Sequence, residues 1–585
     1  MSDFSARVDV FFGDYFRLSP VEATAAGLHD HDGRWPDLTE DGRLQRAEAA
    51  DRWSAELGAF EDADLTADER VDRDVLLLEL AAQRFEAVEL REETWNPMWW
   101  VYLLGSGIFP LLAREFAPLP DRLRSVAGRL AGIPALLDAA RVALSTDAGR
   151  PVARLHTETA IRQLAGVTEL VDDAVQQAEA RSNDPGVADV LPGLRDAAEE
   201  ARTALAHFED HLRDDVIPRS EGEGRLGADL FAAKMRHTMR SDELTPDRIL
   251  AAAEREFDAV RHEMTRLARE GWSRWFPDRE PPLDEGRLVR DVLDRIATDH
   301  TTSDGLLDFC REELGQVEAF CRERNLIGLP DEPLEIRWTP AFLRSFAGAM
   351  LDSPGPLDRD QKSFFSITPI PEDWSPEQAE SYLREMNAKQ LVLLTIHEAV
   401  PGHYLQGVYA NRLESLPRAV FWSGLYAEGW AVYVTQVMMD QGYRADDPGV
   451  LLNHWKYYLR AVVNAIIDAR IHTADMTEDE AVALMVDGGF QEEAEARAKY
   501  NRARLSSTQL STYFVGSMEF WSIEREARQR AAVAARDPRG ADAVPEPRVV
   551  GGFGDTPAFD YRAHLEGCIS HGSPPTSVLR RILLP

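Results

Sequence analysis

Apolar residues recur three or four positions apart over most of the chain, the spacing that places them on one face of an α-helix. The same stretches are rich in Ala, Leu, Glu and Arg, which favour helix. Thr66, Thr245 and Thr477 each precede such a stretch, as N-cap residues do. The pattern predicts a mainly α-helical protein, with long helices at 42–61, 68–92, 120–146, 156–181 and 187–215.

Strand-like segments are few and lie close together near the middle of the chain. They are residues 333–338 and 363–369, with apolar residues at 346–351 between them. We expect them to form a small sheet beside the chemical site. The edge of such a sheet would suit an enzyme that binds an extended polypeptide.

The chain has 585 residues, which is long enough for more than one domain. We place a provisional boundary near residue 330. It separates a helical N-terminal region, residues 1–330, from a C-terminal region, residues 331–585, that contains the motifs described below. One continuous domain is the alternative, because large helical enzymes can reach this length.

The chain is strongly acidic, with 101 Asp and Glu against 65 Lys and Arg and a formal net charge of -36. Such a surface repels nucleic acid and anionic membranes, so neither is expected as a partner. The charge serves solubility or, alternatively, attracts cationic substrates.

Cysteine content and apolar patterning predict a soluble, cytoplasmic protein. Cys310, Cys321 and Cys568 are too few for a disulfide framework, and we expect the first two to be buried apolar residues. The first residues lack the apolar core of a secretory signal, and no apolar stretch is long enough to span a bilayer. None of these sequence features predicts the oligomeric state.

Segment 391–406, LVLLTIHEAVPGHYLQ, carries the strongest chemical signal. In zinc peptidases, a His-Glu pair on a helix supplies one imidazole ligand and an adjacent carboxylate that takes a proton from the attacking water. His397 and Glu398 form such a pair, and His403 is the next histidine. We predict His397 and His403 as metal ligands and Glu398 as the general base.

The two histidines are six residues apart, where the usual motif has four. In a straight helix this spacing would separate them by about 9 Å along the axis and roughly 240° of rotation. Pro401 removes the N–H that would bond to the carbonyl of His397, so the helix must bend or stop there. Gly402 then permits a backbone path that returns His403 to the metal.

A third ligand is available 25 residues after His403. Glu428 lies in LYAEGWAVYVTQ, among apolar and aromatic residues of a predicted helix. A buried carboxylate is costly unless it is paired or bound to metal. Three protein ligands and an open fourth position are typical of a catalytic zinc site. The alternative for Glu428 is a surface glutamate or a salt-bridge partner.

A second polar set lies further along the chain. Asp468 and His472 are four residues apart on one helical face, so Asp468 could orient His472 toward a substrate carbonyl or oxyanion. A core histidine held by a carboxylate is the alternative. The next segment contains Tyr500, Gln509 and Tyr513, and spacing does not decide which tyrosine, if either, faces the metal.

The chain resembles domain of unknown function (DUF) family 885, a group of helical, zincin-like proteins regarded as candidate metallopeptidases. The resemblance covers nearly the whole chain, and the combination of HExxPGH with EGWA is specific. The segments that carry it are residues 11–39, 397–406, 428–434, 468–473, 509–516 and 559–583.

The resemblance implies His397, His403 and Glu428 as metal ligands and Glu398 as the catalytic carboxylate. It also implies a plan similar to the helical gluzincins, whose active sites lie in a deep cleft and place a tyrosine or histidine opposite the zinc. His472 and Tyr513 are therefore the expected catalytic partners.

We expect a large helical, zincin-like (gluzincin) fold with a small β-sheet lining a cleft that the N-terminal region covers. One Zn²⁺ per chain is the expected cofactor, although Mn or Co could fill the same ligands. The expected activity is hydrolysis of amide bonds in short peptides, and we assign Tyr500 and Gln509 to substrate binding. The alternatives are a zinc amidase acting on a non-peptide metabolite and a non-catalytic binding protein on the same scaffold.

Overall fold

Three threonines begin helices where the sequence predicts them. Thr66 and Thr477 each form a capping box at the start of α4 (Ala67–Phe85) and α19 (Glu478–Ala483). Thr245 accepts a hydrogen bond from the Arg248 N–H at the start of α10 (Pro246–Trp275). In this computed structural model, 72% of the chain is helix, which confirms a mainly α protein. The structure describes residues 2–146, 149–339, 344, 348–371, 374–537, 539–544, 552 and 559–584.

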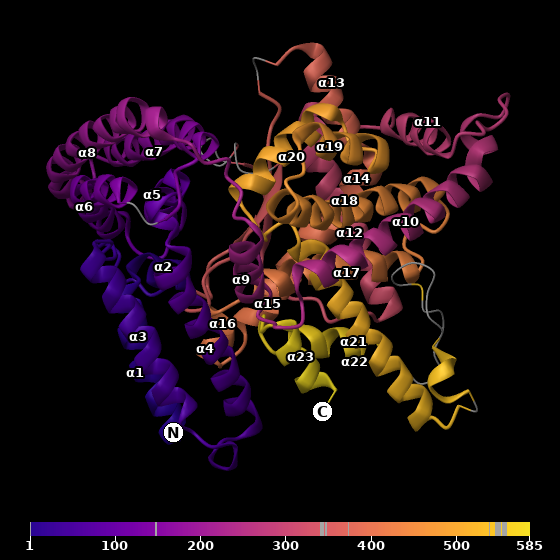
Figure 1. Cartoon of the computed structure of the whole chain (residues 1–585), viewed down its shortest axis with the longest axis horizontal. Helices are drawn as coiled ribbons and strands as arrows, with labels where there is room; N and C mark the ends of the chain where they lie inside the picture. Colours follow the sequence, from indigo (N-terminus) through magenta and orange to yellow (C-terminus); the bar gives the residue numbers. More distant parts are fainter. Residues whose placement is uncertain are drawn as a thin grey trace. The chain divides into compact units, whose positions relative to one another are not determined.

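The chain divides into two compact units (Figure 1). Unit 1 contains Met1–Arg225 and Pro354–Gln361, and unit 2 contains Leu226–Ser353 and Lys362–Pro585. The division near residue 225 lies well before the boundary expected near 330. The reason is that α10 packs along α18 (Pro448–Thr473), so the helices between 226 and 330 belong with the motif-bearing region.

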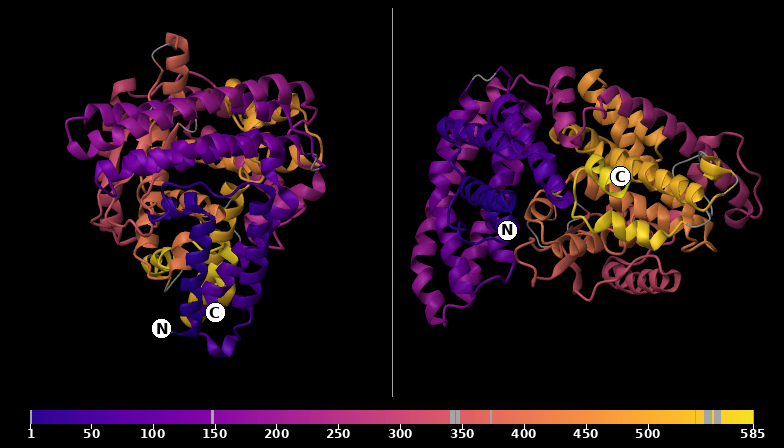
Figure 2. Two further views of the ribbon diagram at one scale, coloured as in Figure 1. Left: turned by 90° about the vertical axis from the view of Figure 1, so that its left-hand side faces the viewer. Right: turned by 90° about the horizontal axis from the view of Figure 1, so that it is seen from below.

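Unit 1 is helical throughout its described elements. Its long helices α6, α7 and α8, purple in Figures 1 and 2, run alongside one another and bury a continuous apolar face. The sequence-predicted helices 120–146, 156–181 and 187–215 correspond to these three. The helices of unit 1 are α1 (Asp3–Leu18), α2 (Pro20–Ala26), α3 (Glu40–Gly58), α4, α5 (Pro97–Ala113), α6 (Leu119–Ser145), α7 (Arg154–Ala180) and α8 (Pro185–His211).

A buried arginine fixes the opening segment of unit 1. Arg129 on α6 donates to the carbonyls of Asp32, at 2.6 Å, and Pro20, at 3.1 Å. Burial lowers the pKa of this guanidinium to about 10. Its side chain also lies over the ring of Trp35, 4.9 Å from the centroid. The opening segment singled out in the sequence is therefore part of the core of unit 1.

The predicted small sheet is present in unit 2. Its strands are β1 (Leu334–Trp338), β2 (Ala349–Asp352) and β3 (Ser363–Ile367), in the order β1-β3-β2. β1 pairs with β3 in parallel, and β2 pairs with β3 antiparallel, so β2 is an edge strand. Of the apolar residues at 346–351, residues 346–347 lie outside the described residues.

The motif-bearing helix lies at the centre of unit 2. Helix α14 (Ala388–Glu398) contacts α12, α17 and α18 and packs on the sheet through Leu391 and Leu394. Cys310 and Cys321 are buried around it and free, as predicted. The other helices of unit 2 are α9 (Ala228–Met239), α10, α11 (Glu285–Ala297), α12 (Leu306–Arg324), α13 (Pro376–Glu385), α15 (His403–Asn411), α16 (Leu416–Val420), α17 (Gly424–Asp440), α18, α19, α20 (Glu493–Leu505), α21 (Thr512–Ala534), α22 (Tyr561–Ile569) and α23 (Thr576–Leu583).

None of the helices in the described ranges combines the length and the apolar character that crossing a bilayer requires.

Candidate metal centre

Helix α14 carries the His-Glu pair at its C-terminal end. Asn387 caps its N-terminus by accepting hydrogen bonds from the N–H groups of Lys389 and Gln390. Every residue from Gln390 to Glu398 is buried. His397 and Glu398 thus occupy the last turn of a helix that is held on all sides, which restricts the movement of both side chains.

The chain bends sharply between the two histidines. Helix α14 ends at Glu398 and α15 begins at His403, with the Gly402 N–H donating to the Ile396 carbonyl at 3.1 Å. A Cβ on Gly402 would lie 1.9 Å from the His397 carbonyl oxygen. The φ of Gly402 is -74°, so glycine is needed here for space and not for a left-handed conformation.

Helix α17 supplies Glu428 and also anchors the bend. Ser423 caps its N-terminus, and the indole N–H of Trp430 donates to the Pro401 carbonyl at 2.9 Å. Gly429 packs directly on Gly516 of α21, where an added Cβ would lie 2.4 Å from backbone. In the EGW sequence, Glu428 is therefore a candidate ligand, Gly429 allows a close helix crossing, and Trp430 holds the bent motif by a hydrogen bond.

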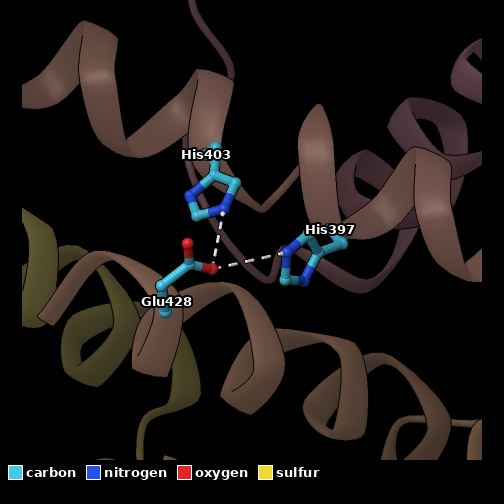
Figure 3. A group of neighbouring side chains, drawn as sticks. All are labelled: His397, His403 and Glu428. Atoms are coloured by element: carbon cyan, nitrogen blue, oxygen red, sulfur yellow. Dashed lines mark ion pairs between the residues drawn. The ribbon is translucent and has the colours of Figure 1, made fainter. Parts of the chain in front are cut away.

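The three predicted ligands converge in the structure (Figure 3). Glu428 Oε2 lies 3.9 Å from His397 Nε2 and 3.6 Å from His403 Nε2. Ligand atoms about 2.1 Å from a tetrahedral zinc ion are about 3.4 Å from one another. The two separations from Glu428 are 0.2 and 0.5 Å wider than that value, and all three ligand atoms lie within 4.8 Å of one another, so the side chains would have to move closer together to hold a zinc ion. Among the described residues, no other group of three His, Cys, Asp or Glu side chains meets in this way.

The three side chains of the cluster differ in protonation state when no metal is bound. Burial, together with the charge of His403, lowers the pKa of His397 to about 3, so its ring is neutral. Burial also opposes charge on His403, but the hydrogen bond and charge of Glu428 raise its pKa to about 9. His403 and Glu428 are therefore an ion pair in the metal-free protein, and a metal ion would displace the proton of His403.

Glu398 lies beside the cluster and next to the sheet. Burial raises its pKa to about 7, while the charge of His403 and a backbone hydrogen bond from Leu351 oppose the increase. Leu351 belongs to β2, the edge strand. A carboxylate with a pKa near neutrality can exchange a proton at physiological pH, which suits a general base and acid.

Tyr513 and Gln509 lie together beside Glu428. The Tyr513 hydroxyl interacts with the Glu428 carboxylate and helps to lower its pKa, and the Gln509 amide donates to the Tyr513 oxygen at 3.3 Å. Burial and the charge of Glu428 raise the pKa of Tyr513 to about 12, so the phenol is protonated and can donate. Of the two tyrosines left open by spacing, Tyr513 is the one at the cluster.

Tyr500 and His472 make hydrogen bonds with backbone groups and not with the three candidate ligands. The Tyr500 hydroxyl donates to the Met476 carbonyl at 3.4 Å, in the core. His472 Nδ1 accepts from the Leu226 N–H at 3.0 Å, and Nε2 lies 3.1 Å from the Ala503 carbonyl oxygen. Because backbone groups occupy both ring nitrogens, the catalytic role expected for His472 does not fit this geometry, and the substrate-binding role expected for Tyr500 lacks support from it.

Asp468 does not orient His472, contrary to expectation. Its carboxylate accepts hydrogen bonds from the Thr508 N–H at 3.1 Å and from the Ser511 N–H and hydroxyl at 3.2 and 2.7 Å. Asp468 therefore fixes the turn between α20 and α21, which places Gln509 and Tyr513. Asp468 thus affects the candidate site only through the positions of Gln509 and Tyr513.

Sequence reasoning missed Tyr457 on α18. Its ring centroid lies 5.7 Å from that of His397, in an edge-on arrangement. Burial and the charge of Glu398 raise its pKa far above the usual value for tyrosine. The neighbouring Tyr458 is buried in the core, and nothing in the sequence KYYLR tells which of the two tyrosines faces the site.

Comparison with solved structures shows the same fold in proteins without an assigned activity. A protein from Shewanella oneidensis, described as a putative lipoprotein of unknown function, is 30% identical over 100% of both chains, with a TM-score of 0.81. A putative lipoprotein from Colwellia psychrerythraea is 16% identical, with 100% of this chain and 98% of that one covered and a TM-score of 0.78.

A putative oligoendopeptidase F from Bacillus anthracis aligns over 92% of this chain and 94% of its own with 10% identity, but its TM-score of 0.25 is too low to support any inference. No curated protein matches the chain. The model of one family, described as bacterial protein of unknown function (DUF885), matches residues 20–583. Because this match spans nearly the whole chain, the protein belongs to the DUF885 family.

Proposed function

We propose that the protein is a zinc-dependent hydrolase that cleaves peptide bonds in short peptides, with a site of the gluzincin type. The observation that carries the proposal is the convergence of His397 Nε2, His403 Nε2 and Glu428 Oε2 next to Glu398. Two imidazoles and one carboxylate are a donor set typical of catalytic zinc. The zincin-like fold and its deep cleft stay predictions.

Each side chain has a distinct task in this proposal. When bound, zinc supplies Lewis acidity, which activates a water molecule and polarises a carbonyl. Glu398 accepts a proton from the attacking water and delivers it to the leaving nitrogen. The C–N bond breaks, the carbonyl carbon gains the hydroxyl of water, and the nitrogen gains the proton. The single O–H of Tyr513, a protonated phenol, turns away from Glu428 to donate a hydrogen bond to the developing oxyanion.

The position of β2 supports a peptide as the substrate. An edge strand offers unpaired backbone groups to an extended chain. The backbone of Leu351 in β2 lies close enough to Glu398 to lower its pKa, so a peptide paired with β2 would pass close to the general base. The same chemistry would cleave a non-peptide amide, and profiling short peptides against small acylated amines separates the two substrate classes.

Metal content is the first test of the proposal. We expect about one zinc per chain by mass spectrometry of the purified protein, and loss of the metal in His403→Ala and in Glu428→Ala. A wild-type protein that takes up no zinc, even after zinc is offered and the excess removed, would rule out the proposed mechanism.

A further inference from the structure

Arg502 lies at the candidate site, and none of the described acidic residues pairs with it. It is an exposed residue in the last turn of α20, and its Nη2 donates to Gln509 Oε1 at 3.1 Å. Gln509 donates in turn to the Tyr513 hydroxyl at 3.3 Å, and the Tyr513 hydroxyl interacts both with the Arg502 guanidinium, which lowers its pKa, and with Glu428. Arg502, Gln509 and Tyr513 thus form one polar group that ends at a candidate metal ligand.

The lack of a carboxylate beside Arg502 distinguishes it from nearby arginines. Arg497, on the same helix, pairs with Glu478 and Glu493, at 3.0 and 2.9 Å. Across the described ranges, no Asp or Glu lies within ion-pair distance of Arg502, although acidic residues outnumber basic ones 101 to 65 in the chain. Most of the five N–H donors of its planar fork are therefore available to a ligand.

We propose that Arg502, with Gln509 and Tyr513 beside it, binds the C-terminal carboxylate of the substrate. This inference rests on the proposed peptidase function and adds the substrate class: peptides with a free C-terminus near the cleaved bond. A guanidinium fork matches a carboxylate with two parallel hydrogen bonds. Exposure of Arg502 leaves this fork accessible to a peptide.

The distance between the Arg502 guanidinium and the metal position limits which peptide bond of the substrate is cleaved. Two polar contacts of about 3 Å, about 2 Å between the two oxygens of Glu428 and one ligand bond of about 2.1 Å separate the guanidinium from the metal position, so the span is at most about 10 Å. An extended residue covers about 3.5 Å. Only one or two residues fit between the cleaved bond and the bound carboxylate. The expected product is a single C-terminal amino acid or a dipeptide.

Two matched substrates test the inference in the full-length, zinc-loaded protein. Acetylated tetra-alanine with a free C-terminal carboxylate should be cleaved with at least tenfold higher kcat/KM than its C-terminal amide. Arg502→Gln should lower kcat/KM for the free peptide about 10- to 100-fold, mainly through KM, and leave the amide almost unchanged. Arg502→Lys should recover part of the loss, and Arg497→Gln, an exposed residue of the same helix, should match the wild type.

Three outcomes would overturn the inference while leaving the proposed function intact. They are equal cleavage of both peptides by the wild type, an equal loss on both in Arg502→Gln, and no loss on either. The second outcome would mean that Arg502 only positions Tyr513.

Failure of the proposed function gives a different result, namely no hydrolysis of either peptide by the zinc-loaded wild type. Calorimetric binding of the same two peptides to zinc-loaded Glu398→Gln then tests Arg502 independently of turnover. Preferential binding of the free peptide, lost in the double variant with Arg502→Gln, supports the carboxylate site. Equal binding of the two peptides, or no binding of either, overturns it.

Discussion

Replacing Gly402 by Ala tests how the bend between the histidines is built. The added Cβ would lie 1.9 Å from the His397 carbonyl oxygen and 2.4 Å from that of Ile396. The φ of Gly402, -74°, is not left-handed, and the magnitude of the penalty is worked out from the overlap. Carbon and carbonyl oxygen normally approach to about 3.3 Å, so one of the two segments must move by about 1.4 Å.

Such a movement affects both stability and metal binding. Overpacking of this kind typically costs about 1–3 kcal/mol in the free energy of unfolding. The shift would also lengthen the hydrogen bond from the Gly402 N–H to the Ile396 carbonyl and displace His403, the first residue of α15. Loss of ligand orientation typically lowers metal affinity 10- to 100-fold, and we expect a decrease of at least that size.

The control is Gly424→Ala in the first turn of α17, where an added Cβ has no neighbour within 4 Å. Zinc affinity is measured by competition with a chelator, and stability by urea denaturation of the metal-free proteins. Gly402→Ala should bind zinc less tightly than the control and unfold at a lower urea concentration. If the two variants bind zinc equally and unfold at the same urea concentration, the explanation of the bend by close approach is refuted.

Three further predictions concern the catalytic groups and the turn that places them. Glu398→Gln should keep one zinc per chain and lose about 10²- to 10⁴-fold in kcat, and a variant with normal turnover would exclude the general-base role. Tyr513→Phe should lower kcat/KM about 10²- to 10³-fold, whereas Tyr500→Phe, which alters a core hydrogen bond, should change it little; equal effects would contradict the assignment. Burial raises the pKa of Asp468 to about 6, above its unfolded value, so the stability of the wild type relative to Asp468→Asn should be greatest below about pH 4 and decrease as the pH rises through 6. Urea denaturation from pH 4 to 8 measures this, and a difference that does not vary with pH would show that Asp468 does not titrate in this way.

Local sequence predicted the elements that carry the site. Apolar periodicity and capping threonines located the long helices, because both act within a few residues of the chain. Pro401 predicted the end of α14, since proline cannot supply the missing N–H. Spacing and residue type predict the ligand set, the family resemblance implies the same set, and the structure brings its three side chains together.

The sequence left undecided whatever depends on contacts between distant segments. The sequence predicts both His472 and Tyr513 as catalytic partners, whereas the structure places the backbone of Leu226 and Ala503 on the two ring nitrogens of His472. Tyr457 and Tyr458 are adjacent and identical in type, so only the packing of α18 decides which one faces the cluster.

Local sequence encodes a helical protein with a bent His-Glu motif and a third carboxylate, Glu428, in the same region. Helix propensity, capping and the missing N–H of proline are local, so these features are encoded where they occur. Tertiary structure alone decided where the two units divide, which tyrosine meets Glu428 and where Arg502 lies. Those outcomes depend on which helices pack together, and the close contact of Gly429 with Gly516 joins residues far apart in the chain.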